Sequence, residues 1–431
     1  MKRLKIGKPY IYVINGKYRL AALIETKEWS RELYFEVEPE NKDYFVSEFS
    51  DCFVFALIYF CMVRGYDIEC EAPMSEQLYY QLMTYFIPIK AATDSLLHNI
   101  YVYAKTQDYE TAVSEKGIAI GASVSGGIDS FYTVVKHIEN VGKSHRLTHL
   151  MLTNLFGKYG EEVEVRKRFT YLYEKMRSVA EELKLPIVTI YSNKYEFDFP
   201  HMINYHTLST CALILALKRL FKVYYFSSAY DFSEFNLSPS NKDSADYDLL
   251  NVQILSDRQL MFYSSGGELN RVDKTQYIAD NSIVQKYLQV CNIKQNNCSS
   301  CRKCRRTLLT LDALGKLDEY ESVFDIAQYR KERRKALVEI YSQKTAFDTE
   351  IIKLMREKKV MPGIYVRLIS VLKRPSYLLL QKLNKNMGIR KLYYLLNLDI
   401  LRFGKEQAMF YRFEHQDRGE INGEKYTKKE Y

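Results

Sequence analysis

The sequence predicts an α/β protein whose central part is a doubly wound parallel sheet, with an α+β module before it and a helical region after it. Three observations support this. Between residues 116 and 290, apolar strand-like segments alternate with helical segments, as in strands joined by crossover helices. The preceding residues mix strand and helix patterns, and from residue 308 the apolar spacing is helical. We therefore expect domains at 1–115, 116–307 and 308–431.

The composition indicates a soluble globular protein, with 47% hydrophobic and 27% charged residues. The 62 Lys and Arg residues outnumber the 53 Asp and Glu residues, which leaves a formal net charge of +9. This mild excess fits an enzyme that handles phosphates or anionic substrates and is too small to indicate nucleic-acid binding. No apolar segment is long enough for a targeting signal or a membrane span, so we expect a cytoplasmic location.

The N-terminal region is predicted to be a compact α+β module without a catalytic constellation. Asn15-Gly16 marks a hairpin turn between two of its strands. The predicted strands are Tyr10–Ile14, Tyr18–Ile24, Leu33–Val37 and Asp67–Glu71, the predicted helices Phe53–Val63 and Gln77–Phe86, and Asn99–Ala104 is predicted to be extended. We expect this module to support the structure or to shape a substrate site.

The stretch Gly117–Tyr132, GIAIGASVSGGIDSFY, is the centre of the predicted sheet. Its apolar run has the length and β-branched content of a buried parallel strand, and Ser125-Gly126-Gly127 ends it. Asp129 and Ser130 stand where a helix N-cap and first turn belong. Two glycines and a helix N-terminus form a site for an anion such as phosphate. The plainer interpretation is an ordinary strand-to-helix turn.

The remaining parallel strands predict where a ligand would bind. Strands are expected at Leu147–Leu155, Ile187–Tyr191 and Val223–Ser228, and helices at Glu162–Leu185 and Thr207–Phe221. In open sheets of this kind ligands bind outside the carboxyl ends of the strands. The site candidates are therefore the residues that follow each strand, namely Ser125–Ser130, Asn154, Ser192–Asn193 and Ser228–Asp231.

Two later segments could contribute to such a site. Asp231–Asp248 is polar and poorly periodic, which predicts either a surface loop or a lid that sets specificity. Gly266–Ile278 places Arg271 and Lys274 near a helix start. Solvated charges on a helix are the alternative for both basic residues.

Four cysteines form a candidate metal site. Cys291, Cys298, Cys301 and Cys304 follow the pattern C-x6-C-x2-C-x2-C, and four thiolates so close together can hold zinc in a closed, structural, tetrahedral site. An iron–sulfur cluster is the alternative, although the bacterial ferredoxin pattern would require a further cysteine downstream. The other cysteines lie in apolar surroundings and are predicted to be reduced core residues, namely Cys52, Cys61, Cys70 and Cys211.

The motif SGG-x-DS at Ser125–Ser130 resembles the loop of the PP-loop ATP pyrophosphatase superfamily, which has an adenine nucleotide alpha hydrolase-like fold. It is not a Walker A loop, since no G-x-x-x-x-G-K-[ST] occurs. Together with the cysteine pattern, over about residues 117 to 310, it resembles the 7-cyano-7-deazaguanine synthases, in particular longer proteins of this type with added regions at both ends. The resemblance implies that ATP is cleaved between its α- and β-phosphates.

The resemblance also implies a reaction and a set of residues. AMP would be transferred to a carboxylate-type substrate, and ammonia or an amine would then attack the product. The implied cofactors are ATP, Mg²⁺ and Zn²⁺, with Ser125, Asp129, Ser130 and Lys274 as catalytic residues. The residues implied to bind the nucleotide are Ser123, Val124, Ser125, Gly126, Gly127, Ile128, Asp129, Ser130 and Asn154.

The sequence does not identify the substrate that would accept AMP. The synthases' usual loop after the fourth strand is replaced here by SSAYDFSEFNLSPS, so a 7-deazaguanine substrate is not implied by this segment. The expected partners are ATP and a small-molecule or protein acceptor; nucleic acid is not required, and a homodimer is compatible with the pattern. Two other functions compete: thiolation of tRNA, for which Cys211 is a lone candidate thiol, and a non-catalytic nucleotide-binding subunit.

The C-terminal region is predicted to be helical, with breaks at Pro362-Gly363 and at Pro375. Ile364–Phe403 mixes apolar and basic residues, which fits either a helix packed on its own protein or one bound to a membrane or to phosphates. The polar end, Glu414–Tyr431, is predicted to be disordered.

Overall fold

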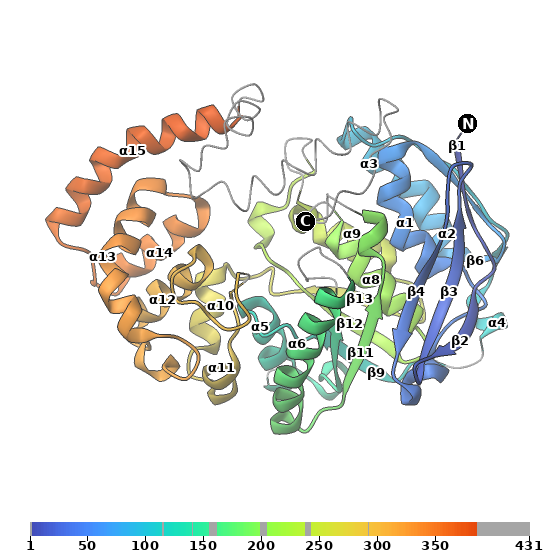
Figure 1. Ribbon diagram of the computed structural model, residues 1–431, viewed down its shortest axis with the longest axis horizontal. Helices are drawn as coiled ribbons and strands as arrows, with labels where there is room; N and C mark the ends of the chain where they lie inside the picture. The colour runs from blue at the N-terminus through green and yellow to red at the C-terminus, as the bar shows by residue number, and fades with distance from the viewer. Residues whose placement is uncertain are drawn as a thin grey trace.

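One sheet of eleven strands runs through the N-terminal and central regions of the chain (Figure 1). The computed structural model describes residues 2–113, 116–139, 141–154, 162–198, 205–237, 243–291 and 293–385. The strand order is β13-β12-β9-β10-β11-β4-β3-β1-β5-β7, and β2 pairs with β3 beside this path. Helices pack on the sheet, and further helices follow it in the chain.

The strands of this sheet are β1 (Lys2–Ile6), β2 (Tyr10–Ile14), β3 (Lys17–Glu25), β4 (Ser30–Val37), β5 (Tyr66–Cys70), β7 (Val102–Tyr103), β9 (Ala119–Ser123), β10 (His149–Thr153), β11 (Ile187–Ser192), β12 (Phe221–Ser227) and β13 (Met261–Ser265). A separate pair is formed by β6 (Met74–Ser75) and β8 (Thr106–Gln107). The helices before residue 260 are α1 (Asp51–Arg64), α2 (Glu76–Gln81), α3 (Ile87–Thr93), α4 (Tyr109–Ala112), α5 (Ile128–Glu139), α6 (Glu162–Leu183), α7 (Tyr195–Asp198), α8 (His206–Ala216) and α9 (Asp248–Leu255). The later helices are α10 (Arg271–Ile278), α11 (Ser282–Tyr287), α12 (Arg302–Leu314), α13 (Ile326–Gln343), α14 (Ala346–Glu357) and α15 (Ile364–Lys385).

The five strands from β9 to β13 are parallel to one another and have β9 at their centre. The chain moves outward from β9 to β10 and β11, then returns to the other side of β9 to form β12 and β13. Such a reversal leaves a crevice at the carboxyl ends of the two strands where the direction changes, here β9 and β12. The predicted α/β class with a mostly parallel central sheet is confirmed, and this order is compatible with a doubly wound fold.

Both faces of the parallel strands are buried, which explains why these strands are apolar without alternation. On one face Met151 and Tyr224 belong to a core that also contains α1 and α8. On the other face Ile120 and Leu152 belong to a core that contains residues of α5, α6 and α12 to α14. The first core includes residues from β1, β3 and β4, so the N-terminal region and the parallel strands share one hydrophobic interior.

The N-terminal strands continue the parallel sheet through an antiparallel pair between β4 and β11. Beyond the end of β11, the Asn193 side chain extends this pairing: its Oδ1 accepts from the Tyr34 N–H at 2.9 Å, and its Nδ2 donates to the Glu32 carbonyl at 2.8 Å. The Ser192 hydroxyl donates to the Tyr34 carbonyl at 2.7 Å. The polar residues that follow β11 therefore join two parts of the sheet, in the place where a ligand-binding role was expected.

A buried carboxylate reinforces this junction. Glu36, on β4, is 4% exposed and accepts hydrogen bonds from Arg19 at 2.7 Å and from Arg166 of α6 at 2.8 Å. Burial alone would raise the pKa of Glu36, but the hydrogen bonds from Arg166 and Arg19 outweigh it and the pKa is lowered. The helix after β10 is thus tied to a strand of the N-terminal region.

Most predicted elements of the N-terminal region are present. Asn15 and Gly16 both have positive φ (50° and 76°), as the two-residue hairpin turn requires. The elements that were not predicted include β1 in this region and β13 and α9 later in the chain. The predicted helix Thr207–Phe221 is too long, because α8 ends at Ala216 and Phe221 already begins β12. Apolar periodicity alone does not separate a buried helix from the buried strand that follows it.

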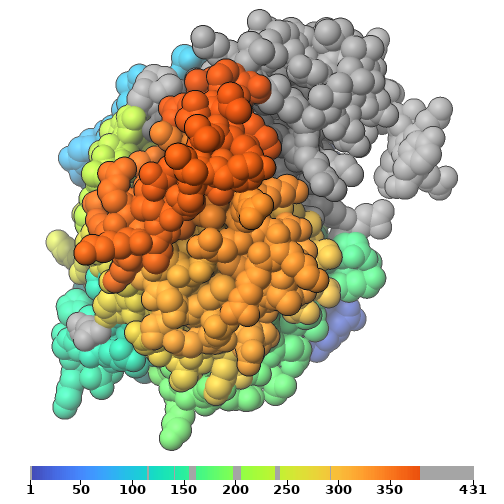
Figure 2. Space-filling model, turned by 90° about the vertical axis from the view of Figure 1, so that its left-hand side faces the viewer, coloured from blue at the N-terminus to red at the C-terminus, as the bar shows by residue number. Residues whose placement is uncertain are grey.

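The four helices α12 to α15 lie together on one side of the molecule, as Figure 2 shows in orange and red. The predicted break at Pro362-Gly363 is confirmed, since α14 ends at Glu357 and α15 begins at Ile364. The predicted break at Pro375 is wrong, because α15 continues through it. Pro375 has no N–H, so the helix loses the hydrogen bond to the Val371 carbonyl. Because Val371 is 67% exposed, water can donate to that carbonyl in its place.

The predicted C-terminal tail, Glu414–Tyr431, lies outside the described residues, as do residues 386–403 of the predicted basic segment Ile364–Phe403. None of the helices in the described ranges combines the length and the apolar content that crossing a bilayer requires.

The sheet junction makes a stability prediction. Asn193→Ala leaves the Tyr34 N–H and the Glu32 carbonyl without their partners, so we expect the free energy of unfolding to fall by about 1–3 kcal/mol. Asn99→Ala, at an exposed position, should change it by less than about 0.5 kcal/mol. Urea denaturation of the full chain measures both values, and equal stability of the two variants would contradict the proposed role of Asn193.

Candidate functional site

A tight loop links β9 to α5 at the centre of the sheet. The buried Ser130 hydroxyl fixes this loop: it accepts from the Ser125 N–H at 2.9 Å and donates to the Ser123 carbonyl at 2.9 Å. The first N–H groups of α5 have no partner within the helix, and the helix dipole adds partial positive charge there. The loop therefore presents a polar, electropositive edge at the crevice between β9 and β12.

Gly126 has a structural reason to be glycine. Its φ of 79° is in the left-handed region, and an added Cβ would lie 3.0 Å from the Cβ of Gln289. The Gly126 carbonyl accepts from the Gln289 N–H at 2.7 Å. Gln289 stands two positions before Cys291, so the loop is directly bonded to the segment that begins the cysteine cluster.

Two basic residues of α10 meet the carboxylate of Asp129 in this loop. Arg271 pairs with Asp129 Oδ2, and Lys274 Nζ lies 3.6 Å from Asp129 Oδ1. Lys274 also donates to the Ser228 carbonyl, just beyond β12, at 2.8 Å. Both cations meet the Asp129 carboxylate, while Glu268 also acts on Lys274 and Glu350 interacts with Arg271, so an anion at the loop would have two basic side chains beside it.

The Lys274 side chain is almost completely buried, with 1% of its surface exposed, whereas that of Arg271 is 33% exposed. Burial lowers the pKa of Lys274, Asp129 opposes this effect, and the neighbouring Arg271 adds to it. A buried ammonium group with a single carboxylate 3.6 Å away can accept a further anionic partner.

The loop residues predicted to bind a nucleotide differ in their exposure to solvent. Half-exposed residues alternate with buried ones along the loop. The half-exposed residues are Ser123, Ser125, Gly127 and Asp129, and the buried ones are Val124, Gly126, Ile128 and Ser130. Val124 and Ile128 belong to the hydrophobic core, so only their backbone groups are available to a ligand.

Asn154 lies at the carboxyl end of β10, as predicted, but its amide is already engaged. Its Nδ2 donates to the Ser192 carbonyl at 2.8 Å and its Oδ1 accepts from the Ser192 N–H at 3.0 Å. In this arrangement Asn154 connects the ends of β10 and β11.

Sequence reasoning did not predict that α14 lies at the rim of the site. Phe347 stacks on Tyr230 with 6.0 Å between ring centroids, and the guanidinium of Arg271 lies 5.3 Å from the Phe347 ring. Asp348 pairs with Arg306 of α12 at 3.2 Å and caps α14 together with Thr345. The capping pattern at Thr345 and Asp348 is visible in the sequence. It predicts where a helix begins, but it does not predict which other elements that helix contacts.

The four predicted metal ligands come together. The Sγ atoms of Cys291, Cys298, Cys301 and Cys304 all lie within 4.8 Å of one another, and two of the separations are 4.0 Å. Tetrahedral zinc with Zn–S bonds of about 2.3 Å requires S–S separations of about 3.8 Å. The cluster could therefore hold a metal ion such as zinc.

Backbone groups support this assignment. The N–H groups of Lys294, Cys301 and Cys304 point to the sulfurs of Cys291, Cys298 and Cys301 at 3.2 to 3.4 Å. The hydrogen bond from the Cys304 side chain outweighs burial and lowers the pKa of Cys301 to about 5, which favours the thiolate that a metal requires. The remaining cysteines are free thiols, as predicted, with Cys52, Cys61 and Cys211 buried and Cys70 half-buried.

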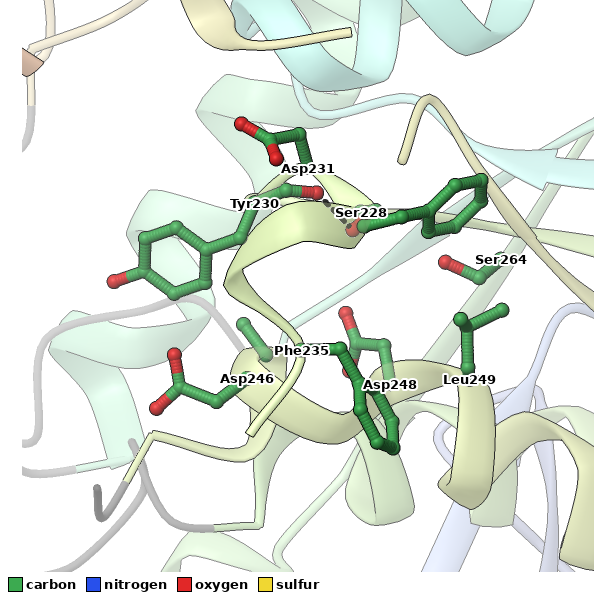
Figure 3. A pocket seen from close by; sticks show the side chains of 10 residues that line it. Ser228, Tyr230, Asp231, Phe235, Asp246, Asp248, Leu249 and Ser264 are labelled. Carbon is green, nitrogen blue, oxygen red and sulfur yellow. Dashed lines mark hydrogen bonds between the residues drawn. The ribbon is translucent and has the colours of Figure 1, made fainter. Parts of the chain in front are cut away.

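A pocket lies beside Ser228, whose carbonyl accepts the hydrogen bond from Lys274, and Figure 3 shows the residues that line it. Its empty volume is about 220 Å³ including open solvent, but the space that a water molecule can enter is only about 10 Å³, which is room for about one water. Its lining residues come from the ends of β12 and β13, from the segment Asp231–Asp248 and from α9; they are Ser228, Tyr230, Asp231, Phe232, Phe235, Ala245, Asp246, Asp248, Leu249 and Ser264. Residues 231–237 and 243–248, the described parts of the segment predicted to be a surface loop or a specificity lid, supply six of these ten lining residues.

The cysteine cluster predicts one zinc ion per chain. Cys298→Ser removes one of four thiolates, so we expect the purified variant to lose most of its zinc and to unfold at a lower denaturant concentration than the parent chain. Cys70→Ser, at a half-buried thiol outside the cluster, should retain the metal. Elemental analysis measures the zinc content, and iron in place of zinc, or full zinc content in Cys298→Ser, would contradict the assignment.

No protein-family model matches the chain, and no curated protein or solved structure is detectably similar to it, so its function is inferred from its own residues and contacts.

Proposed function

We propose that the chain is an ATP-dependent enzyme of the PP-loop type, which cleaves ATP between the α- and β-phosphates and transfers AMP to a carboxylate-type substrate. Ammonia or an amine then displaces AMP. The observation that carries this proposal is the meeting of the Ser125–Ser130 loop with Lys274 and Arg271 at the carboxyl ends of β9 and β12.

The loop supplies the donors that a departing pyrophosphate needs. The backbone N–H groups from Gly126 onward and the half-exposed Ser125 hydroxyl would bind its oxygens. Lys274 and Arg271 would balance the charge that develops on the leaving group, which is the main catalytic contribution in phosphoryl and nucleotidyl transfer. The buried Ser130 hydroxyl would keep the loop in shape.

Asp129 fits the expected role in binding Mg²⁺. Its Oδ2 pairs with Arg271, while its Oδ1 is buried and makes no hydrogen bond within the described residues. A carboxylate oxygen without a hydrogen bond is a suitable ligand for Mg²⁺. When bound, the ion would neutralise phosphate charge beside the two basic residues.

Zinc in this proposal is structural. Four thiolates complete a tetrahedral shell and leave no position for substrate. The cluster instead holds the segment that bonds to Gly126 through Gln289, so it would keep the loop in position.

Neither competing function has a specific contact in its favour. Cys211, the candidate thiol for a thiolation reaction, is fully buried in α8, and burial raises its pKa far above that of an ordinary thiol. A non-catalytic nucleotide-binding subunit would use the same loop, and it would differ from the proposed enzyme in binding ATP without turning it over. A 7-deazaguanine carboxylate remains one member of the proposed substrate class.

The first test is the fate of ATP. With an acceptor present, wild-type chain should form AMP and pyrophosphate, and Lys274→Met should lower the rate by about a hundredfold or more, because a buried cation at the leaving group is lost. Lys286→Ala removes an exposed lysine of α11 that pairs with Glu182 of α6, and it should have no effect. Formation of ADP would refute the proposal, and MgATP binding without turnover would identify the non-catalytic subunit.

The second test uses the pH dependence of MgATP binding. The pKa of Lys274 is lowered, so as the pH rises its positive charge is lost before that of an ordinary lysine. We therefore expect MgATP affinity in wild type to fall as the pH rises, at a lower pH than the titration of an ordinary lysine would produce. In Lys274→Arg the charge persists, so the fall should disappear. Calorimetric titration measures this, and identical profiles would exclude Lys274 as a phosphate ligand.

A further inference from the structure

Helix α15 packs on the protein with one face only. Val366 and Ser370 of this helix are buried, and the Ser370 Oγ lies 3.3 Å from the Val338 carbonyl oxygen of α13. Ile369 packs against the same hydrophobic core as Val366. In Figure 1 the helix lies at the outer edge of the molecule, and its opposite face is turned to solvent.

The solvent-facing side of α15 carries a line of large apolar side chains. We call this line the α15 stripe, and it consists of Ile364, Tyr365, Leu368, Val371, Leu372 and Leu378. Spacings of three, four and seven positions relate these residues, so they lie along one side of a helix with about 3.6 residues per turn. Each of them is between 44% and 76% exposed. Apolar side chains gathered in this way mark a contact with another protein or with a membrane.

Basic side chains border the α15 stripe on both sides. Arg367 and Arg374 are seven positions apart and follow one edge of the stripe. At the other edge, the guanidinium of Arg334 of α13 lies 5.5 Å from the centroid of the Tyr365 ring. None of these three arginines pairs with a carboxylate within the described residues, and α15 itself contains no Asp or Glu. A partner that matches this surface is therefore apolar where it meets the stripe and anionic around it.

A second copy of the chain does not match this surface. In a two-fold symmetric contact the same patch faces itself. The arginines that border the stripe of one copy would then lie near those of the other copy, and α15 provides no carboxylate to separate them. Like charges brought together in this way oppose association.

An anionic lipid surface matches both features of the patch. A helix can lie in the plane of such a surface with its apolar side roughly 5–10 Å below the headgroups and its basic side chains at their level. The α15 stripe is about 21 Å long at about 1.5 Å per residue, and Figure 2 shows the helix, in red, as a ridge on the molecular surface. The whole stripe can therefore meet a flat surface, whereas a protein partner would need a groove of matching shape.

We infer that α15 docks the protein on a membrane surface that contains anionic lipids. The α15 stripe enters the boundary between headgroups and acyl chains, and Arg334, Arg367 and Arg374 contact lipid phosphates. The helix backbone stays at the hydrated level of the headgroups, so water still reaches the Val371 carbonyl that Pro375 leaves without a donor. This inference does not depend on the proposed ATP chemistry.

Vesicle flotation with the full chain tests the lipid partner. Wild type should bind phosphatidylcholine vesicles that contain about 30% phosphatidylglycerol, and added salt should weaken this binding. Its affinity for pure phosphatidylcholine should be at least tenfold lower, because the arginines then lose their anionic partners. Arg374→Gln should lower the affinity for the anionic vesicles about fivefold and leave that for phosphatidylcholine unchanged.

A matched pair of variants tests the apolar stripe. Leu368→Glu places a carboxylate in the middle of the stripe and should lower the affinity for anionic vesicles at least tenfold. Leu96→Glu is the control, because Leu96 lies outside α15 and is 57% exposed, against 59% for Leu368. It should bind vesicles as wild type does. Both side chains face solvent, so both variants should keep the stability of wild type in urea denaturation.

Three results would overturn the inference. They are the absence of binding to anionic vesicles, equal binding to both kinds of vesicle, and an unchanged affinity in Leu368→Glu. A dimer of wild type in analytical ultracentrifugation that Leu368→Glu dissociates, without any vesicle binding, would assign the stripe to a second copy of the chain instead.

Discussion

The hydrogen bond from the Gln289 N–H to the Gly126 carbonyl is the contact on which the site depends. On one side of it is the loop at the end of the central strand, closed by the Ser130 hydroxyl. On the other is the segment that enters the four-cysteine cluster. Gly126 has no room for a side chain there, so the loop conformation and the position of the cluster determine each other. Metal binding, loop geometry and any phosphate site are thereby linked through a few residues.

The charged side chains around the loop determine which kind of ligand it would bind. Asp129 holds Arg271 and the buried Lys274 against the loop, which keeps both cations in place before any ligand arrives. The adjoining pocket has the opposite character, with carboxylates and no basic side chain in its lining. The N-terminal region contributes by supporting α9, and α14 contributes by placing Phe347 over the rim.

The parts of this arrangement that sequence reasoning predicted are local. The loop Ser125–Ser130, the cysteine spacing and the Asn15-Gly16 turn each depend on residues close together in the chain. The parts it missed are long-range. Asn193 pairs with β4 about 160 positions away, and Phe347 reaches Tyr230 more than 100 positions away, so neither leaves a pattern in a short window. Pro375 was misjudged because the cost of a lost hydrogen bond depends on whether water can reach the freed carbonyl.

The central claim is that the Ser125–Ser130 loop binds the phosphates that leave as pyrophosphate. The most direct measurement is a structure of the full chain with Mg²⁺ and α,β-methylene ATP, in which the bond to be cleaved is blocked. The account predicts the β- and γ-phosphates on the loop N–H groups, within hydrogen-bond distance of Lys274, and the α-phosphate facing the pocket at Ser228. A nucleotide bound elsewhere, or one with its γ-phosphate directed into that pocket, would contradict it.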